Sequence, residues 1–411
     1  MMSKDDTNSE TRVRPQRQLF VADYGLTPEH RIEHCSILCE KGGIMAVGGE
    51  SAFAIESRIE IFRIPNAYVT PGFIDSHIHG AGGFDASSII YGQQSTLADM
   101  SRELARHGVT SFVPTVVCDH REKMLENLSL LADMFQNPAP GADAVGIHLE
   151  GPFINLDKRG SMLGSAVTPI DMGYARELVA AGGGHVKRVT FAPELEGAVQ
   201  LVEFLCENNI APSMGHSMAN EAEALRAIDA GARCCTHLFN GMPPLSQREM
   251  NLTSVALTDR RVSVELIIDG RHLHPRIVDL ACRCKMDFRV AAISDATMAA
   301  GMPSGQYRIG PTETRVENGF SRSLNGILAG TAAFLDEGWH SLMSYSHTTE
   351  TYAASAVSRN SALQLGLKDR GRLMPGLRAD MAFFECGTNR PLMTVRRGEI
   401  VFAAEGVLPH G

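Results

Sequence analysis

The sequence lacks the features of several large protein classes. No run approaches the roughly 18 apolar residues of a membrane span, and residues 1–18 lack the apolar core of a secretory signal. Acidic residues outnumber basic ones, 47 against 38, and a net charge of −9 is unfavourable for gripping nucleic acid or an anionic membrane. We therefore expect a cytoplasmic protein that binds neither nucleic acid nor a membrane.

Closely spaced cysteine pairs of the C-x-x-C type are also missing. The nine cysteines are scattered along the chain, so neither a zinc knuckle nor a redox motif is indicated. We interpret them as buried free thiols. The hydrophobic fraction of 44% and charged fraction of 21% are ordinary for a soluble globular protein with a large core.

The pattern of polar, apolar and glycine residues changes twice along the chain. Residues 1–17 are polar and without helical or strand periodicity, which predicts a flexible tail. Short β-prone pieces separated by glycine-rich turns fill residues 18–70, and the same texture returns over residues 372–411. We expect these two ends to form one small β-sandwich domain beside a barrel domain of residues 71–371.

Within residues 71–371, apolar strands alternate with amphipathic helices, which is typical of βα units around a parallel sheet. For example, Leu97, Met100 and Leu104 lie at helical spacing before Gly108, which can end a helix. Eight strands close a (β/α)8 TIM-type barrel. The eight strand candidates lie at 69–79, 109–117, 144–150, 186–192, 211–216, 233–239, 262–269 and 288–295.

Polar residues end several of these strands, at the face where barrel enzymes place their chemistry. His77 and His79 stand two residues apart, so both imidazoles face one side of a strand and can reach one divalent ion. Glu150 ends an apolar strand, where a cation or an ion pair with lysine or arginine would relieve the cost of burial. His216 and His237 end successive strands, so barrel geometry brings them side by side.

These residues predict a metal site. Glu150, His216 and His237 would complete a set of three ligands that leaves room for water or substrate. Zinc, iron or another first-row ion fits such ligands. Asp295 ends the last strand, where it can take a proton from water and deliver it to a departing nitrogen. The alternative role is the N-cap of a following helix, and both roles can hold together, but the position in the barrel favours catalysis.

Eight phrases of the chain are distinctive: PGFIDSHIHG at 71–80, HLEGPFIN at 148–155, GHS at 215–217, THLFNGM at 236–242, DGRH at 269–272, SDA at 294–296, LAGT at 328–331 and GRLMPGLRADM at 371–381. Together they resemble the N-acetylglucosamine-6-phosphate deacetylases of the amidohydrolase superfamily. HLEGPF followed by THLFN is the most specific pair. The urease-like and dihydroorotase-like members of the superfamily usually have a carbamylated lysine at the position of Glu150, which separates them from this chain.

The resemblance implies hydrolysis of the N-acetyl group of an amino-sugar 6-phosphate, most simply N-acetylglucosamine 6-phosphate, by a homodimer with one or two divalent ions. It implies that Glu150, His216 and His237 hold the principal ion. By the same resemblance, His77 and His79 complete a second site bridged by Glu150, and Asp295 is catalytic. The substrate-binding positions implied are Ser161, Met162, Asn240, Gly241, Arg248, His272, Leu328, Ala329 and Gly330.

Two departures from the family pattern concern the substrate. Met162 stands where the family generally has a substrate-contacting histidine, and Gln247 precedes Arg248 where the family tends to have another histidine. Arg248 is expected to grip phosphate, and part of that clamp can come from a partner subunit. N-acetylgalactosamine 6-phosphate or another N-acyl compound therefore remains an alternative substrate. A non-catalytic barrel used for binding or assembly is a further alternative.

Overall fold

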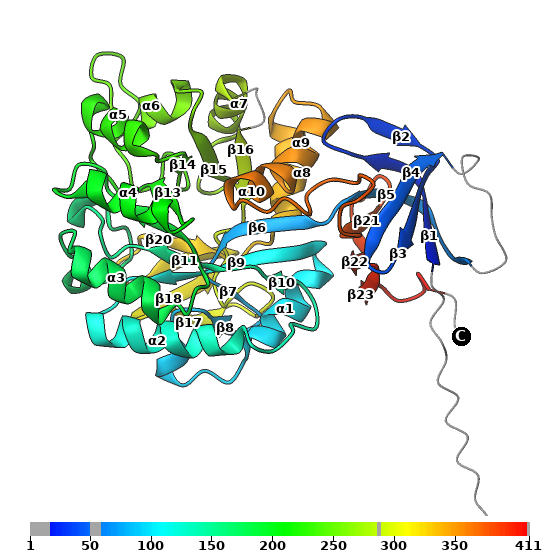
Figure 1. Ribbon diagram of the computed structural model, residues 1–411, viewed down its shortest axis with the longest axis horizontal. Coiled ribbons are helices and arrows are strands. Elements are labelled where there is room, and N and C mark those ends of the chain that lie inside the picture. Colours follow the sequence, from blue (N-terminus) through cyan, green and yellow to red (C-terminus); the bar gives the residue numbers. More distant parts are fainter. Residues whose placement is uncertain (1–16, 50–58, 286–288, 409–411) are drawn as a thin grey trace, which may run out of the picture.

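A computed structural model describes residues 17–49, 59–285 and 289–408. It consists of a barrel beside a smaller sheet built from both chain ends (Figure 1). The predicted tail lies outside the described residues, apart from Arg17, which begins the first strand. Over the described ranges, no helix combines the length and the apolar character needed to cross a bilayer.

The barrel strands follow one another around the ring in chain order, and every neighbouring pair from β6–β9 to β15–β16 is parallel. Between the last and first strands, the Asp295 N–H donates to the His77 carbonyl oxygen at 3.1 Å. The predicted eight-stranded barrel is confirmed. Its strands are β6 (Phe73–Ile78), β9 (Val109–Val117), β11 (Ile147–Glu150), β12 (Val186–Phe191), β13 (Ala211–Met214), β14 (Cys234–Cys235), β15 (Ser263–Ile267) and β16 (Val290–Ile293), and β10 (Asp143–Ala144) also pairs with β9.

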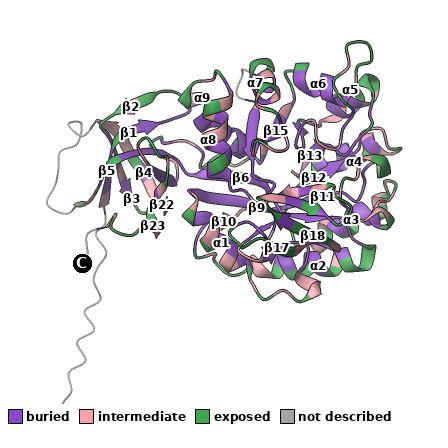
Figure 2. Ribbon diagram, turned by 180° about the vertical axis from the view of Figure 1, so that it is seen from behind, coloured by how far each residue is buried: buried purple, intermediate pink, exposed green. Residues whose placement is uncertain are grey.

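Helices cover the outside of the barrel, so strands such as β9 are buried at every position (Figure 2). The first helix begins with a capping box of Thr96 and Asp99, and Gly108 follows its end with a φ of +78°, as its predicted stop requires. The helices are α1 (Leu97–Arg106), α2 (Arg121–Met134), α3 (Met172–Ala181), α4 (Ala198–Glu207), α5 (Glu221–Ala230), α6 (Leu252–Thr258), α7 (Pro275–Cys284), α8 (Leu335–Tyr345), α9 (Glu350–Ala356) and α10 (Arg359–Gln364).

Four predicted strands need correction. Residues 144–150 are divided between the end of β10 and β11, and are not one strand. Residues 69–79 form two strands, because the chain leaves the small sheet at Gly72, where a Cβ would lie 2.2 Å from the hydroxyl of Thr110. Of residues 233–239 only β14 is strand, since His237 and Phe239 turn the backbone to positive φ. The start of the last candidate, residue 288, lies outside the described residues, and β16 ends before Asp295.

The small sheet joins the two chain ends, because β5 of the N-terminal part pairs with both β1 and β21. Phe20, Ile64, Met381 and Phe383 share its hydrophobic core. Both chain ends therefore contribute to one small sheet beside the barrel, as the predicted fold class requires. Its strands run in the order β23 (Glu399–Ala403), β22 (Pro391–Arg396), β21 (Met381–Glu385), β5 (Ile59–Pro71), β1 (Arg17–Leu26), β3 (Cys35–Glu40) and β4 (Gly43–Gly49), with β2 (Arg31–Glu33) paired to β1.

An antiparallel meander, which we did not predict, follows the last barrel strand. It consists of β17 (Gly305–Ile309), β18 (Thr312–Glu317), β19 (Phe320–Ser323) and β20 (Leu328–Thr331). The alternative role of Asp295 as the N-cap of a following helix is therefore wrong. The Thr312 hydroxyl donates to the Ser161 carbonyl oxygen at 3.1 Å, which ties the meander to the loop after β11.

An aromatic cluster fills the junction between the barrel and the small sheet. Trp339 of α8 is fully buried, and its indole N–H donates to the Tyr68 hydroxyl at 3.1 Å. Phe384 stacks on both Tyr68 and Phe73, with ring centroids 5.6 and 5.1 Å apart.

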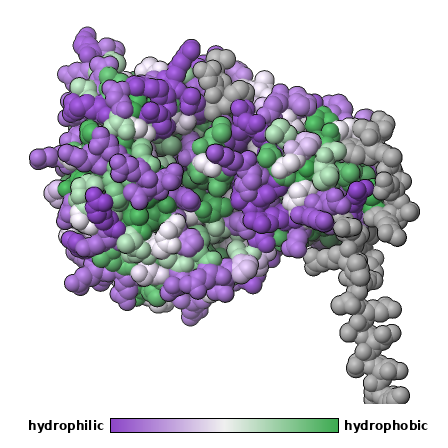
Figure 3. Space-filling model, in the orientation of Figure 1, coloured by the Kyte–Doolittle hydropathy of each residue, from purple (hydrophilic) through white to green (hydrophobic). Residues whose placement is uncertain are grey.

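On the face shown in Figure 3, hydrophilic side chains dominate the protruding surface and apolar ones lie mostly in the hollows.

All nine cysteines are free, as predicted. Their expected burial is correct for six of them, whereas Cys206 and Cys284 are exposed and Cys386 is half-buried.

Candidate active site

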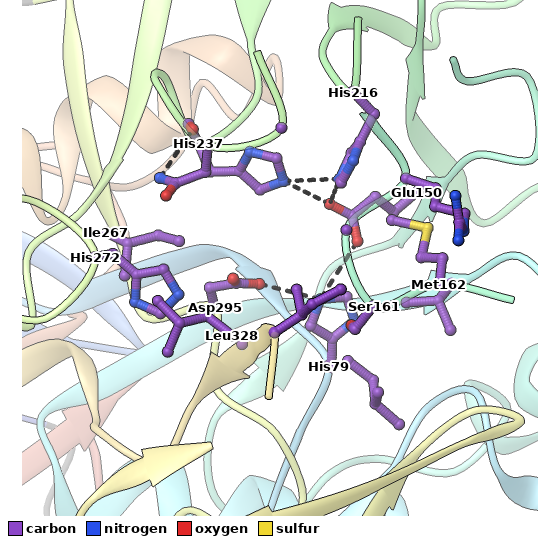
Figure 4. Close-up of a pocket in the computed structure, with 18 residues that line it drawn as sticks. His79, Glu150, Ser161, Met162, His216, His237, Ile267, His272, Asp295 and Leu328 are labelled. Carbon is purple, nitrogen blue, oxygen red and sulfur yellow. Dashed lines mark hydrogen bonds and ion pairs between the residues drawn. The ribbon is translucent and has the colours of Figure 1, made fainter. Parts of the chain in front are cut away.

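A pocket with a volume of about 200 Å³ lies where the barrel strands end. Loops after β11, β13, β14 and β16 and the end of the meander supply its walls (Figure 4). The lining residues are His79, Val117, Glu150, Arg159, Gly160, Ser161, Met162, His216, His237, Asn240, Gly241, Ile267, His272, Asp295, Ile309, Ile327, Leu328 and Gly330.

The predicted metal-site residues come together in two groups, Glu150 with His216 and His237, and His77 with His79 and Asp295. Within each group, one potential ligand atom from each residue lies within 4.8 Å of the others. His77 is fully buried below the pocket and does not line it.

Glu150 lies between the two groups. Its Oε1 is 2.8 Å from His237 Nε2 and 3.1 Å from His216 Nε2. Its Oε2 is 3.5 Å from His79 Nε2. The ion-pair partners of Glu150 within the described ranges are histidines, so the alternative of a lysine or arginine partner is not realised there.

In two of the histidines, the contact of Nδ1 determines that Nε2 is the nitrogen free to bind an ion. Nδ1 lies 2.6 Å from the Lys158 carbonyl oxygen in His216 and 3.2 Å from the Thr115 carbonyl oxygen in His79. Because a carbonyl oxygen only accepts, each Nδ1 carries the proton and each Nε2 presents a lone pair.

This donor set fits a divalent cation. Lone pairs of Nε2 atoms facing carboxylate oxygens repel one another unless a cation or a proton lies between them. Two such buried atoms, His77 Nε2 and Asp295 Oδ1, have no hydrogen-bond partner among the described residues. Imidazole nitrogens with carboxylate oxygens are the ligands that zinc and other first-row ions take in catalytic sites.

Both carboxylates of the site are held in the anionic form. Burial raises the pKa of Glu150, but the charge of His77 and the close contacts with His216 and His237 outweigh burial and hold that pKa well below its usual value. Burial likewise raises the pKa of Asp295, but the close contact with His79, followed by the charges of His77 and His79, outweighs burial and holds that pKa below its usual value. Asp295 Oδ1 lies 3.0 Å from His79 Nε2.

Three site residues adopt the left-handed backbone region, with φ of +48° at His216, +27° at His237 and +50° at Asp295. Such a conformation costs a non-glycine residue on the order of 1–3 kcal/mol and is frequent at functional sites. All three follow the last residue of a barrel strand. The turn of the backbone points their side chains toward the pocket (Figure 4).

Gly241 has a steric role that its predicted role in substrate binding did not include. Its φ is +61°, and a Cβ at this position would lie 2.9 Å from His216 Nδ1 and 3.1 Å from the Lys158 carbonyl oxygen. A side chain here would therefore disturb the hydrogen bond that orients His216.

Most of the predicted substrate-binding residues line the pocket: Ser161, Met162, Asn240, Gly241, His272, Leu328 and Gly330. Ala329 is buried and does not line it, and Arg248 is exposed on the loop between β14 and α6. Met162 belongs to an apolar cluster, with its sulfur 3.6 Å from the Cys118 thiol, which donates to it.

Two residues of this site, Arg159 and Asp269, were not predicted from the sequence. Arg159 is the one lysine or arginine among the residues lining the pocket, and its position next to the predicted Ser161 was the available signal. Asp269 Oδ2 lies 2.8 Å from His272 Nδ1 and orients that ring. It belongs to the DGRH phrase, from which only His272 was taken.

Comparisons with known proteins agree with this geometry. The profile of the Amidohydrolase family matches residues 68–402. The N-acetylgalactosamine-6-phosphate deacetylase of Escherichia coli O157:H7 is 33% identical over 318 residues, covering 77% of this chain and 83% of the relative. The N-acetylglucosamine-6-phosphate deacetylase of Bacillus subtilis (strain 168) is 31% identical over 392 residues, covering 94% and 98%.

Solved structures are also similar. A mutant N-acetyl-D-glucosamine-6-phosphate deacetylase from Mycobacterium smegmatis, in complex with N-acetyl-D-glucosamine-6-phosphate, has a TM-score of 0.87 and 29% identity. The match covers 94% of this chain and all of that one, 100%. The enzyme of the same name from Thermotoga maritima has a TM-score of 0.82 and 30% identity, covering 93% and 98%.

Proposed function

Because this chain belongs to the amidohydrolase family, and within it to the deacetylases of N-acetylated amino-sugar 6-phosphates, we propose that it hydrolyses N-acetylglucosamine 6-phosphate to acetate and the amino-sugar phosphate. The observation that carries the proposal is the anionic Glu150, surrounded by histidine Nε2 atoms at the wall of a pocket that also holds Asp295. The similarity to enzymes of this name over nearly the whole chain supports it.

We propose one or two divalent ions, zinc or iron, as the cofactor. Glu150, His216 and His237 would hold the principal ion, and His77 and His79, with Glu150 as a bridge, would hold the second. When bound, a divalent ion polarises the amide carbonyl and lowers the pKa of water.

Asp295 supplies the proton transfers. Its anionic carboxylate accepts a proton as the water oxygen bonds to the acetyl carbon, and it then protonates the nitrogen as the carbon–nitrogen bond breaks. The backbone hydrogen bond to His77 and the contact with His79 hold this carboxylate in place. Acetate and a free amine leave, so no oxidant or further reactant is required.

The sugar phosphate is bound by polar groups on the pocket wall. The pocket is lined by Asn240 and by His272, whose ring is oriented by Asp269. Arg159 also lines the pocket, and its guanidinium can pair with phosphate. Arg248 is exposed outside the pocket, so it would contact phosphate from a neighbouring subunit or after movement of its loop.

We further propose a cytoplasmic homodimer. The exposed Arg248 favours a phosphate clamp that is completed between two subunits. All nine cysteines are free, and free thiols persist in reducing compartments such as the cytoplasm. Light scattering of the purified protein tests the assembly, and a monomer at assay concentration would contradict it.

A substrate panel tests the proposed reaction. The zinc-loaded or iron-loaded protein is assayed for acetate release from N-acetylglucosamine 6-phosphate, its galactosamine isomer, the unphosphorylated sugar and N-acetyl amino acids. We expect the highest kcat/KM with an amino-sugar 6-phosphate. No release from either sugar phosphate would overturn the substrate assignment, and a purified protein that binds no ion would favour the non-catalytic barrel.

N-acetylgalactosamine 6-phosphate is the second candidate substrate, because a relative named for it is 33% identical to this chain. The ratio of kcat/KM for the two isomers in the same panel decides between them. A third outcome is release of the acyl group only from other N-acyl compounds. That result would show that the pocket, which Met162 lines, is altered for a different substrate.

A further inference from the structure

His77 differs from the other histidines of the site in the contact of its second ring nitrogen. Its Nδ1 lies 3.1 Å from a carboxylate oxygen of Glu265, whereas the Nδ1 atoms of His79 and His216 face backbone carbonyl oxygens. A carboxylate partner fixes the orientation of a ligating imidazole and makes it a stronger electron donor than a carbonyl partner does.

Glu265 is unusually placed for a carboxylate. It lies in β15 with an exposed fraction of 0%, so its charge needs compensation inside the barrel. Arg188 of β12, also fully buried, forms an ion pair with it, and the Ser76 hydroxyl donates to it at 3.3 Å. This pairing leaves Glu265 anionic and able to accept the His77 N–H.

Arg188 is itself anchored at a second point. Its Nη2 donates to Gln364 Oε1 at 2.9 Å, and Gln364 is the last residue of α10. The chain of contacts from α10 through Arg188 and Glu265 to His77 crosses the barrel interior beneath the pocket. It reaches neither Nδ1 of His216 nor Nδ1 of His237.

We propose that Glu265 is a positioning residue for a second divalent-cation site, at which it holds the His77 proton on Nδ1 and aims the Nε2 lone pair between Glu150 and Asp295. His77 Nε2 lies 3.3 Å from Asp295 Oδ1 and 3.5 Å from Glu150 Oε1. This inference rests on the metal dependence in the proposed function. It adds that loss of the Glu265 carboxylate weakens binding of the second ion without weakening binding of the principal ion.

Metal titration of Glu265→Gln tests the inference. The metal-free variant and wild type are titrated with Zn²⁺ against a fluorescent chelator, which gives the dissociation constant of each bound ion. Loss of an outer carboxylate typically weakens metal binding about 10–100-fold. We expect that loss for the second ion alone, with binding at Glu150, His216 and His237 unchanged.

Two further variants separate positioning from folding. Glu265→Gln leaves Arg188 as a buried unpaired cation, so the double variant Glu265→Gln/Arg188→Met removes both charges together. The matched control is Asp380→Asn, because Asp380 is another buried carboxylate paired with an arginine, 3.0 Å from Arg378, directly before β21 of the small sheet. The double variant should lose the second ion, and the control should retain both.

Equal weakening of both ions in a folded Glu265 variant would overturn the inference. The inference would also be overturned by an unchanged dissociation constant for the second ion, by a wild-type chain that takes up one ion only, or by the same selective loss in Asp380→Asn. The titration measures no turnover. Failure of the proposed reaction, seen as absent acetate release, is therefore distinguishable from failure of this inference.

Discussion

The Asp295 carboxylate lies 3.0 Å from His79 and is turned into the pocket by a backbone φ of +50°. Replacing it with asparagine keeps the size of the side chain but removes the group that accepts the proton. We expect Asp295→Asn to lower kcat about 10²–10⁴-fold with little change in KM, the range found for general acid–base groups. Steady-state kinetics on N-acetylglucosamine 6-phosphate measure this, and an unchanged kcat would contradict the mechanism.

Met162 packs in an apolar cluster with Cys118 and Ile309 at the pocket wall. An imidazole there would lose water without gaining a hydrogen-bond partner from that cluster. We expect Met162→His to lower the free energy of unfolding by about 1–3 kcal/mol. Met162→Leu, a swap of similar volume, should cost less than about 1.5 kcal/mol. Urea unfolding measures both, and a histidine variant as stable as the leucine variant would contradict this account.

The residues that sequence reasoning identified share one property: they lie at the ends of strands or just after them, so the barrel topology alone places them at one face. His77, His216 and Asp295 are of this kind. Glu265 and Arg188 could not be found in the same way, because they lie within strands and meet across 77 positions of sequence. Only a charged residue inside an apolar strand hinted at a buried partner, and nothing in the sequence specified which one.

At the scale of elements, strands buried on both faces were predictable because their apolar runs are continuous, as in β9. The meander of β17 to β20 was missed although β18 alternates buried and exposed residues. Its strands are short, and glycines at positions 305, 310, 319 and 326 interrupt the pattern. The run of small residues after Asp295 suggested a helix cap instead.

The end of α1 and the start of α8 are joined by His107. Its Nδ1 lies 3.0 Å from an oxygen of Asp336, and its ring stacks on Phe334 with centroids 3.6 Å apart. Burial lowers the pKa of His107, but the hydrogen bonds with Asp336 and Glu103 outweigh burial and raise that pKa to about 9. The imidazole is therefore charged in the folded protein at neutral pH.

A pKa raised by folding gives stability that is complete below the unfolded value of about 6.5 and is lost as pH rises through about 9. We expect His107→Gln to lower the free energy of unfolding by about 1–2 kcal/mol near pH 6, in the range of hydrogen bonds to charged groups. The difference from wild type should shrink by about pH 10. Urea titrations at several pH values measure it, and a difference that grows with pH would refute the assignment.

At the scale of the whole molecule, a charge network joins the barrel to the small sheet. Asp143 of β10 lies 2.7 Å from Arg378 and 3.0 Å from Arg396 of β22. We expect Asp143→Asn to lower the free energy of unfolding by about 3 kcal/mol, because it leaves two largely buried cations short of a partner. Asp229→Asn, in an exposed pair with Arg261, is the control and should cost less than about 1 kcal/mol. Equal losses would contradict the network's role.

The union of the two chain ends was predictable from their shared texture of short strands and glycine turns. The pairing itself was not, because the register that sets Phe383 opposite Val69 depends on contacts between residues more than 300 positions apart. Such pairings become visible only once the barrel has brought the two ends together.

The junction between the barrel and the small sheet contains the only tryptophan of the chain. Trp339 is shielded from water and donates its indole proton to Tyr68, so its fluorescence should be emitted at short wavelength in the native protein. Separation of the sheet from the barrel would hydrate the indole and shift the emission to the red. One natural chromophore thus reports the opening of this seam, without any label, while circular dichroism follows the helices of the barrel.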